Sequence, residues 1–173
     1  IARRRILWLL ILVLANGLTT KVIAMNDQIL KEIVLLAAFI PLLIGTGGNV
    51  GAQSSTVVIR GLSTQKLKSL GAFKAVVKEA ITGALLGILM MLVVFPFAWW
   101  QGEGPLIAFA VGISLISITT LAATAGAILP LLFDRMGLDP ALMSSPFITT
   151  VTDIAGVFIY LSTANWLLNS SML

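Results

Sequence analysis

The sequence predicts an all-α membrane protein with five transmembrane helices in each subunit. Of its 173 residues, 58% are hydrophobic and only 10% are charged, whereas a soluble domain carries about 25% charged residues. The apolar residues gather in long runs, and about 20 such residues suffice to cross a bilayer as a helix. A soluble chain of this length has no interior large enough for so much apolar surface. Lipid is therefore the expected solvent for most of the chain.

Five apolar runs are long enough to cross the hydrocarbon layer, which is about 30 Å thick. Backbone groups have no water partner in lipid, so each run is expected to form a helix. The short alternating segments of a membrane β-barrel are absent from the sequence. We predict one transmembrane domain over residues 1–173, with spans at about 6–25, 33–59, 80–100, 105–133 and 140–169.

Polar segments separate the predicted spans, and their lysines and arginines indicate the orientation. Nine of these cations fall on one side of the membrane and two, Lys21 and Lys31, on the other. The positive side faces the cytoplasm, which predicts a plasma membrane protein (a bacterial or archaeal inner membrane) with a cytoplasmic N-terminus and an external C-terminus. The nine are Arg3, Arg4, Arg5, Arg60, Lys66, Lys68, Lys74, Lys78 and Arg135.

Composition excludes several classes of function. The chain has no cysteine and no histidine, which removes thiolate metal sites, disulfides and the commonest general base. The net charge of +4 comes from the cations between the spans, which set the orientation of the protein in the membrane. No nucleic-acid partner is therefore expected, and membrane lipids are the expected partners. An enzyme is not expected either, because no acid pair or nucleophile–base pair can be assembled near the middle of the membrane.

The last span carries Asp153, a carboxylate inside an apolar run. Such an acid costs about 3 kcal/mol to insert and usually faces a cavity where it serves transport. Ser145 and Thr149 precede it at intervals of four residues, so the three side chains form one row on the helix. Carboxylate and hydroxyl oxygens are ligands for hard cations. The other interpretation is that Asp153 only donates or accepts a structural hydrogen bond between helices.

The second span is unusual because it holds four glycines within seven residues, from Gly45 to Gly51. Glycine is unfavourable in a helix unless something must approach closely. Gly47 and Gly51 form a small-xxx-small face suited to tight helix contact. The amides of Asn49 and Gln53 would have no hydrogen-bond partner in lipid, however, and helix packing does not explain them.

These residues resemble a known family. Residues 41–53 resemble the P-x-x-x-G-x-G-G-N-x-G-x-Q signature of the MgtE family of magnesium channels. Asp139-Pro140-Ala141-Leu142, followed by Pro146 and by residues 152–156 (Thr-Asp-Ile-Ala-Gly), is similar to that family's last-helix motif. The resemblance extends over essentially the whole chain, and two motifs in the right order make it specific.

The resemblance implies a homodimer of ten helices with a central pore lined by the second and fifth spans of each subunit. It implies Mg²⁺ as the transported and bound ion, held by Asp153 with Thr149 and Ser145 on the preceding turns. Other members carry Ala at the position of Thr149 and Asn at the position of Ser145. A role of the backbone carbonyl therefore carries over to Thr149, whereas a role of the Asn side-chain amide does not carry over to Ser145.

Three further pore-facing groups are predicted in the second span: Gly45, Gly48 and Asn49. Asp139 either contributes to a cytoplasmic vestibule or caps the last helix. The family also carries cytoplasmic magnesium-sensing domains before the membrane part, and because the chain begins with Ile1 rather than Met, we expect it to be a domain of a longer protein.

One alternative function remains open at this point. A proton-coupled secondary transporter for divalent cations would use Asp153 as its coupling acid. Such proteins normally show inverted repeats and several coupled ionisable groups, and the sequence shows one such acid and no repeat. A Mg²⁺-selective channel is therefore the favoured interpretation.

Overall fold

The computed structural model describes residues 2–64 and 71–171, and the described residues form helices without any strand. This result confirms the predicted all-α class. The helices are α1 (Ala2–Met25), α2 (Asp27–Glu32), α3 (Val34–Ser63), α5 (Ala72–Ala98), α6 (Pro105–Arg135) and α7 (Pro140–Ser171), with a π-helical turn, η1 (Trp99–Glu103), between α5 and α6.

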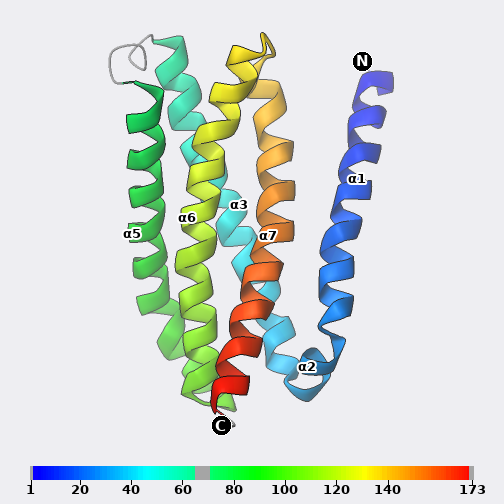
Figure 1. Ribbon diagram of the computed structural model, residues 1–173, viewed down its shortest axis with the longest axis vertical. Coiled ribbons are helices and arrows are strands. Elements are labelled where there is room, and N and C mark those ends of the chain that lie inside the picture. The colour runs from blue at the N-terminus through cyan, green and yellow to red at the C-terminus, as the bar shows by residue number, and fades with distance from the viewer. Residues whose placement is uncertain (1, 65–70, 172–173) are drawn as a thin grey trace.

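Four long helices form a bundle and α1 stands at its edge (Figure 1). The central helix is α6, which packs on α3, α5 and α7, whereas α1 packs on α7. Figure 1 shows the N-terminus and the C-terminus at opposite ends of the molecule, as an odd number of full-length helices requires. The upper part of α1 lies away from the bundle, and the short helix α2 joins its lower end to α3.

The composition of α6 explains its central position. Small side chains on several faces, including Ala108, Ala122, Ala123 and Ala127, are fully buried and let three neighbouring helices approach. In the most apolar stretch of each helix, 61% of α6 is buried, compared with 17% of α5. Helix α5 is therefore the most exposed member of the bundle, and its outward face is apolar.

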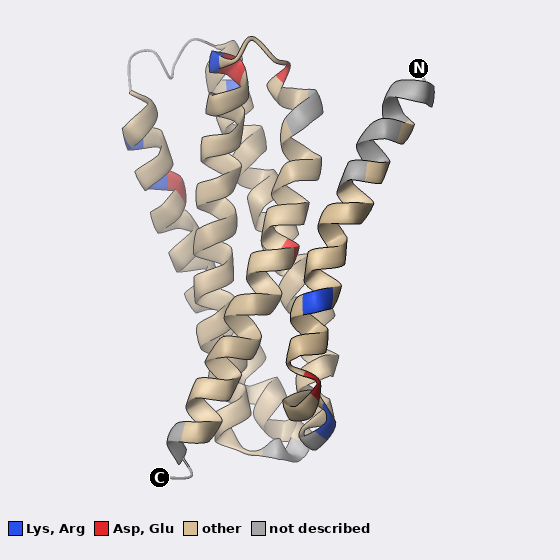
Figure 2. Ribbon diagram, turned by 45° about the vertical axis from the view of Figure 1, so that its right-hand side comes forward, with Lys and Arg blue, Asp and Glu red and all other residues tan. Residues whose placement is uncertain are grey.

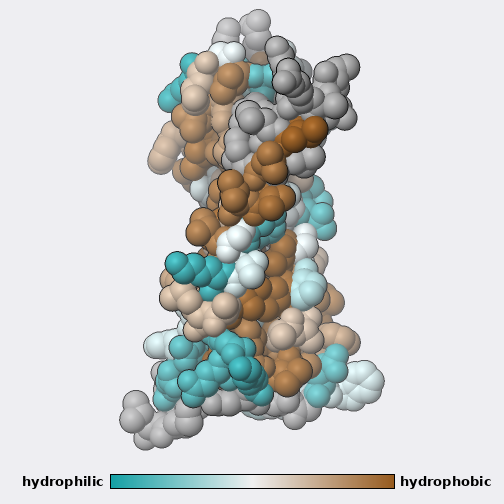
Figure 3. Space-filling view, turned by 90° about the vertical axis from the view of Figure 1, so that its right-hand side faces the viewer, coloured by the Kyte–Doolittle hydropathy of each residue, from teal (hydrophilic) through white to brown (hydrophobic). Residues whose placement is uncertain are grey.

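Among the residues that the structure describes, four helices are long and apolar enough to cross a membrane: Val34–Ser63, Ala72–Gln101, Pro105–Arg135 and Ser144–Asn169. They correspond to the second to fifth predicted spans. The part of the first span that qualifies by composition among the described residues is shorter, Leu12–Met25. Charged residues gather mainly near the two ends of the molecule (Figure 2). Figure 3 shows hydrophobic surface along the middle of the face beside α1 and hydrophilic groups toward the lower end, where α2 lies.

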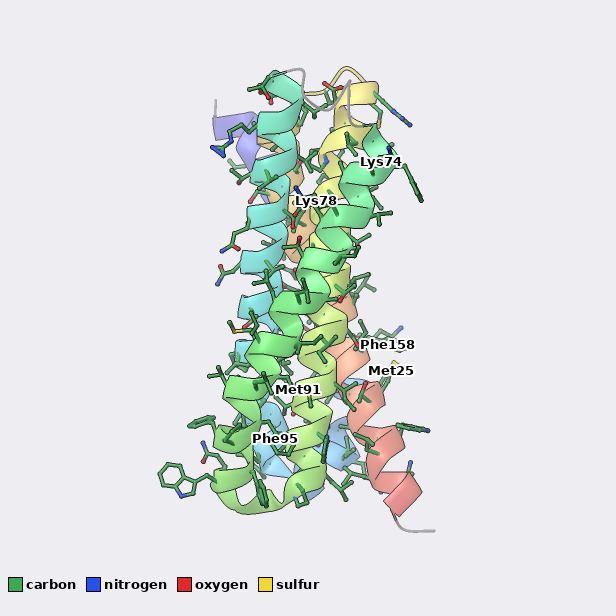
Figure 4. All side chains as sticks on the ribbon, turned by 90° about the vertical axis from the view of Figure 1, so that its left-hand side faces the viewer. Met25, Lys74, Lys78, Met91, Phe95 and Phe158 are labelled. Atoms are coloured by element: carbon green, nitrogen blue, oxygen red, sulfur yellow. The ribbon has the colours of Figure 1, made fainter. Side chains whose placement is uncertain are left out.

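The predicted connections are too long. Helices α3 and α5 both continue into the segment predicted as a polar connection (60–79), and residues 27–32 form α2 rather than a loop. The segment between the third and fourth predicted spans (101–104) largely belongs to the turn η1, which ends at Glu103 and is followed by Gly104 with φ of 85°. Figure 4 shows Lys74 and Lys78 on the first turns of α5, with Met91 and Phe95 further along it. Long cationic side chains reach the interface from a helix end, so polar residues there do not end the helix.

A buried hydrogen bond fixes α7 against α3. The hydroxyl of Tyr160, which is fully buried, donates to the backbone carbonyl of Leu36 at 3.1 Å. Both residues belong to the apolar core that α3, α6 and α7 share.

Candidate functional site

The polar row predicted on α7 lies on one face of the helix, as its spacing requires. Ser145 and Thr149 are exposed and Asp153 is half-buried, while the intervening Ile148 and Thr152 are fully buried. The row therefore faces away from the interior of the single chain. The Thr149 hydroxyl donates to the backbone carbonyls of Pro146 (3.0 Å) and Ser145 (3.3 Å) in its own helix, so its oxygen can still accept a bond from a ligand.

A second polar row runs along α3. Asn49, Gln53, Thr56 and Arg60 are all exposed, whereas Val50, Ser54 and Val58 between them are buried. The amides thus lie on the outward face of the helix.

The two rows are neighbours because α3 and α7 pack through small residues. A methyl group built on Gly48 would lie 3.9 Å from the Thr149 methyl carbon, and one built on Gly47 would lie 3.7 Å from Thr152 Cβ. The tightest approach is at Gly51, where a methyl group would lie 2.5 Å from an Ile148 methyl carbon. The rows of Asn49 and Thr149 consequently border the same exposed strip.

The glycines of α3 serve two different purposes. Gly47 and Gly51 are buried against α6 and α7, so their small-xxx-small face is used inside the chain and not at its outer surface. Gly45 is exposed with nothing within 4 Å of a built methyl group, and Gly48 has only the ordinary contact with Thr149. Packing within the chain therefore explains the first pair and leaves the second pair unexplained.

Two hollows open at the end of the bundle where α3 ends and α7 begins. A groove of about 490 Å³ lies between these helices and is lined in part by Thr56, Arg60 and Ser145. A cavity of about 630 Å³ next to it is lined by Asp134, Arg135 and Asp139, among others. The groove continues the exposed strip to the end of the bundle.

Asp139 caps α7, which is one of its two predicted roles. Its carboxylate accepts a hydrogen bond at 2.9 Å from the backbone N–H of Ala141 in the first turn of the helix. Its side chain remains exposed, so the carboxylate also borders the cavity.

The chemistry of the strip suits a cation that keeps its water. The donors that one chain offers are hydroxyl, amide and carbonyl oxygens with a single carboxylate, Asp153. Among the described residues, no three acids, histidines or cysteines lie close enough together to enclose a metal ion. Mg²⁺ sheds water reluctantly and is commonly held through few protein oxygens.

Sequence comparison supplies the family. The family model described as MgtE, divalent cation transporter, matches residues 40–163, which include α5 and α6 and most of α3 and α7. The chain belongs to the MgtE family.

Curated MgtE relatives match nearly the whole chain. A magnesium transporter MgtE from Thermus thermophilus is 39% identical over 166 residues, and one from Enterococcus faecalis is 36% identical over 168. These alignments cover 96% and 95% of this chain but 37% and 36% of those relatives. A Bacillus subtilis relative of the same name is 33% identical over 170 residues. The chain thus spans somewhat more than a third of the length of these MgtE proteins.

One buried acid of this MgtE domain was missed by the sequence prediction. Glu79 is only 9% exposed and accepts a hydrogen bond at 2.7 Å from the hydroxyl of Ser54 on α3. It was assigned to a connection because Lys74 and Lys78 precede it. The signal that could have identified it is the spacing of Glu79, Gly83 and Gly87, which places the acid on the glycine face of α5 that is buried.

Proposed function

We propose that the chain is the membrane domain of a Mg²⁺ channel, which passes hydrated Mg²⁺ down its electrochemical gradient. The pore lies on the two-fold axis of a homodimer and is lined by α3 and α7 of each subunit. The single observation that carries the proposal is the exposed polar strip, in which the amides of α3 and the Ser145–Thr149–Asp153 row of α7 run side by side along apolar helices.

A second subunit gives this strip a suitable environment. Facing lipid, Asp153 alone would cost about 3 kcal/mol, and the amides of Asn49 and Gln53 would lack partners. A two-fold axis beside the strip brings two copies of it together around a shared path. Gly45, which has no neighbour within 4 Å, and Gly48, which has only an ordinary contact with Thr149, would then widen the path or let the partner helix approach.

The charge of the ion follows from the symmetry. Two Asp153 carboxylates across the axis match one divalent cation, while a monovalent ion leaves one negative charge uncompensated at low dielectric. Hydroxyl and carbonyl oxygens at Thr149 and Ser145 would contact the water shell of the ion rather than replace it. The curated relatives are named magnesium transporters, which favours Mg²⁺ over other hard cations.

Helix α1 serves as the fifth span in this proposal. Its 24 residues extend about 36 Å as a helix, and in Figure 1 it runs along most of the length of the bundle, with its upper part set apart. With the cation-rich side in the cytoplasm, the N-terminus is cytoplasmic and the C-terminus external. Regulatory domains of the same protein would precede α1, consistent with the length of the relatives.

A proton-coupled transporter is the second candidate, and one observation favours it. The sequence suggested a single intramembrane acid, but Glu79 is a second buried acid in the bundle. Coupled transport normally uses several ionisable groups. In this mechanism Asp153 exchanges a proton for the cation.

Flux measurements on liposomes distinguish the two candidates. Protein that includes this domain is reconstituted with a K⁺-diffusion potential, and Mg²⁺ entry is measured with a fluorescent indicator while a permeant buffer removes the proton gradient. The channel predicts uptake that follows the potential, which contributes about 4.6 kcal/mol per 100 mV for a divalent ion. Uptake that stops without the proton gradient would instead establish the coupled transporter.

A further inference from the structure

Glu79 on α5, a helix with an apolar outer face, forms a hydrogen bond with α3, which carries one of the two polar rows. Glu79 lies in the N-terminal part of α5, directly after Lys78, which Figure 4 labels. Its carboxylate accepts the Ser54 hydroxyl bond at 2.7 Å, and both side chains are at least 91% buried. A hydrogen bond buried away from water is electrostatically stronger than one at a solvated surface.

Three helices meet closely where this bond forms. A methyl group built on Gly83, one turn from Glu79, would lie 2.5 Å from the carbonyl oxygen of Thr119 on α6. A methyl group on Gly126 would overlap the carbonyl oxygen of Gly51 and lie 3.1 Å from Ser54 Cβ. Small residues thus let α5 and α3 both pack closely on α6 near the buried acid.

The position of Ser54 gives the bond its importance. Ser54 directly follows Gln53, so its side chain leaves α3 about 100° around the helix from the polar row. Contacts of α3 are mainly with α6 and α7, and α5 touches it at few points. The Glu79–Ser54 bond is therefore well placed to fix the rotation of α3 about its own axis.

We propose that Glu79 is a positioning residue for the ion path: it holds Ser54 so that Asn49 and Gln53 face the strip that Asp153 borders. The inference rests on the proposed function, because it takes this face of α3 as pore-lining. Glu79 itself touches no ion in this account, and it acts on transport only through the orientation of α3.

Cysteine labelling tests the orientation directly, because the natural chain has no cysteine and each introduced thiol is the only one in it. Gln53→Cys reports the polar face, and Val57→Cys, whose position is 54% exposed and lies about 40° around the helix, reports the flank nearer α5. Labelling rates with a charged, water-soluble maleimide are measured in proteoliposomes, and their ratio measures the rotation of α3.

The expected ratio strongly favours Gln53→Cys in the otherwise natural chain. In Glu79→Leu it falls about tenfold, which is the change in population expected from losing one buried hydrogen bond. Glu79→Gln restores the natural ratio, since an amide oxygen accepts the Ser54 bond. Ser54→Ala reproduces the fall by removing the donor, and it serves in place of Glu79→Leu if that variant does not fold.

Thr119→Val is the matched control. Its hydroxyl is equally buried but donates only to carbonyls of its own helix, Leu115 at 2.7 Å and Ile116 at 3.2 Å, so its loss leaves the ratio unchanged. A ratio that stays constant in folded Glu79→Leu and Ser54→Ala overturns the inference and leaves the proposed pore intact. No labelling of Gln53→Cys in the natural background overturns the proposed pore itself, and with it the role of Glu79.

Discussion

The α5–α6 pair and the α3–α7 pair both contain glycines, but these glycines have different roles in the two pairs. Between α5 and α6, glycines remove side chains so that backbones touch: Gly83 and Gly87 lie directly against the Thr119 region of α6. Between α3 and α7, Gly47 and Gly51 instead make room for the side chains of Thr152 and Ile148, whereas Gly45 has no neighbour and Gly48 has only an ordinary contact with the Thr149 methyl group. The outer face of α5 is apolar, whereas α3 and α7 expose amides, hydroxyls and a carboxylate.

This difference separates packing from function within one membrane domain. A glycine that contacts a neighbouring backbone is explained by van der Waals packing, which drives helix association in lipid. A glycine beside an exposed amide with nothing in contact is not explained in that way. The glycines that packing does not explain, the amides and Asp153 all border one strip. We therefore propose that the ion path runs there and that the apolar face of α5 contacts lipid.

The largest expected effect on folding is at the packed pair. Gly83→Ala would place a methyl group 2.5 Å from the Thr119 carbonyl oxygen and 2.6 Å from Ala123 Cβ. Because neither the backbone nor a methyl group can swing aside, we expect a loss of about 3 kcal/mol in the free energy of unfolding. Denaturation by SDS in mixed micelles, followed by circular dichroism, measures it; no loss would mean that the two helices separate readily.

A smaller effect is expected at the bond between α3 and α7. Tyr160→Phe removes the donor to the Leu36 carbonyl and keeps the ring in the core. The expected loss in the free energy of unfolding is about 1 kcal/mol, the usual net value of one hydrogen bond. The same micelle titration checks this value. A loss as large as that of Gly83→Ala would show that the α3–α7 contact depends on polar bonds rather than on packing.

The smallest effect on folding, and of opposite sign, is expected on the polar strip. Gly45→Ala meets nothing within 4 Å in the chain and introduces a better helix former, so stability should rise by up to about 1 kcal/mol. Mg²⁺ flux should nevertheless fall, because the added methyl group enters the path or the contact with the second subunit. Unchanged flux in this stable variant would remove Gly45 from the strip.

Much of this architecture could be predicted from the sequence because lipid imposes simple rules. The second to fifth spans were located to within a few residues, except at the start of α5, since an apolar run in lipid must be helical. The rows of Asn49 and Gln53 and of Thr149 and Asp153 followed from helical spacing alone.

Other features depend on contacts that no periodicity contains. The helical turns that open α5 were assigned to a connection, because hydropathy does not distinguish a buried acid such as Glu79 from the solvated end of a helix. Nor does the sequence reveal which of the four glycines from Gly45 to Gly51 contact a neighbour, since that depends on where Ile118 and Ile148 of other helices lie. The Ser54–Glu79 bond joins residues 25 positions apart, beyond the reach of any local pattern.

The most direct test of the central claim is Mg²⁺ flux through Asp153→Asn in liposomes at fixed membrane potential. The matched control is Asp27→Asn, which removes an exposed acid that pairs with Lys31 on α2, far from the strip along the chain. We predict that Asp153→Asn keeps its helical content and loses flux by about 100-fold or more, since the ion loses both carboxylates that balance its charge, while Asp27→Asn conducts like the natural protein. Equal flux in both variants would contradict the assignment of the ion path to α3 and α7.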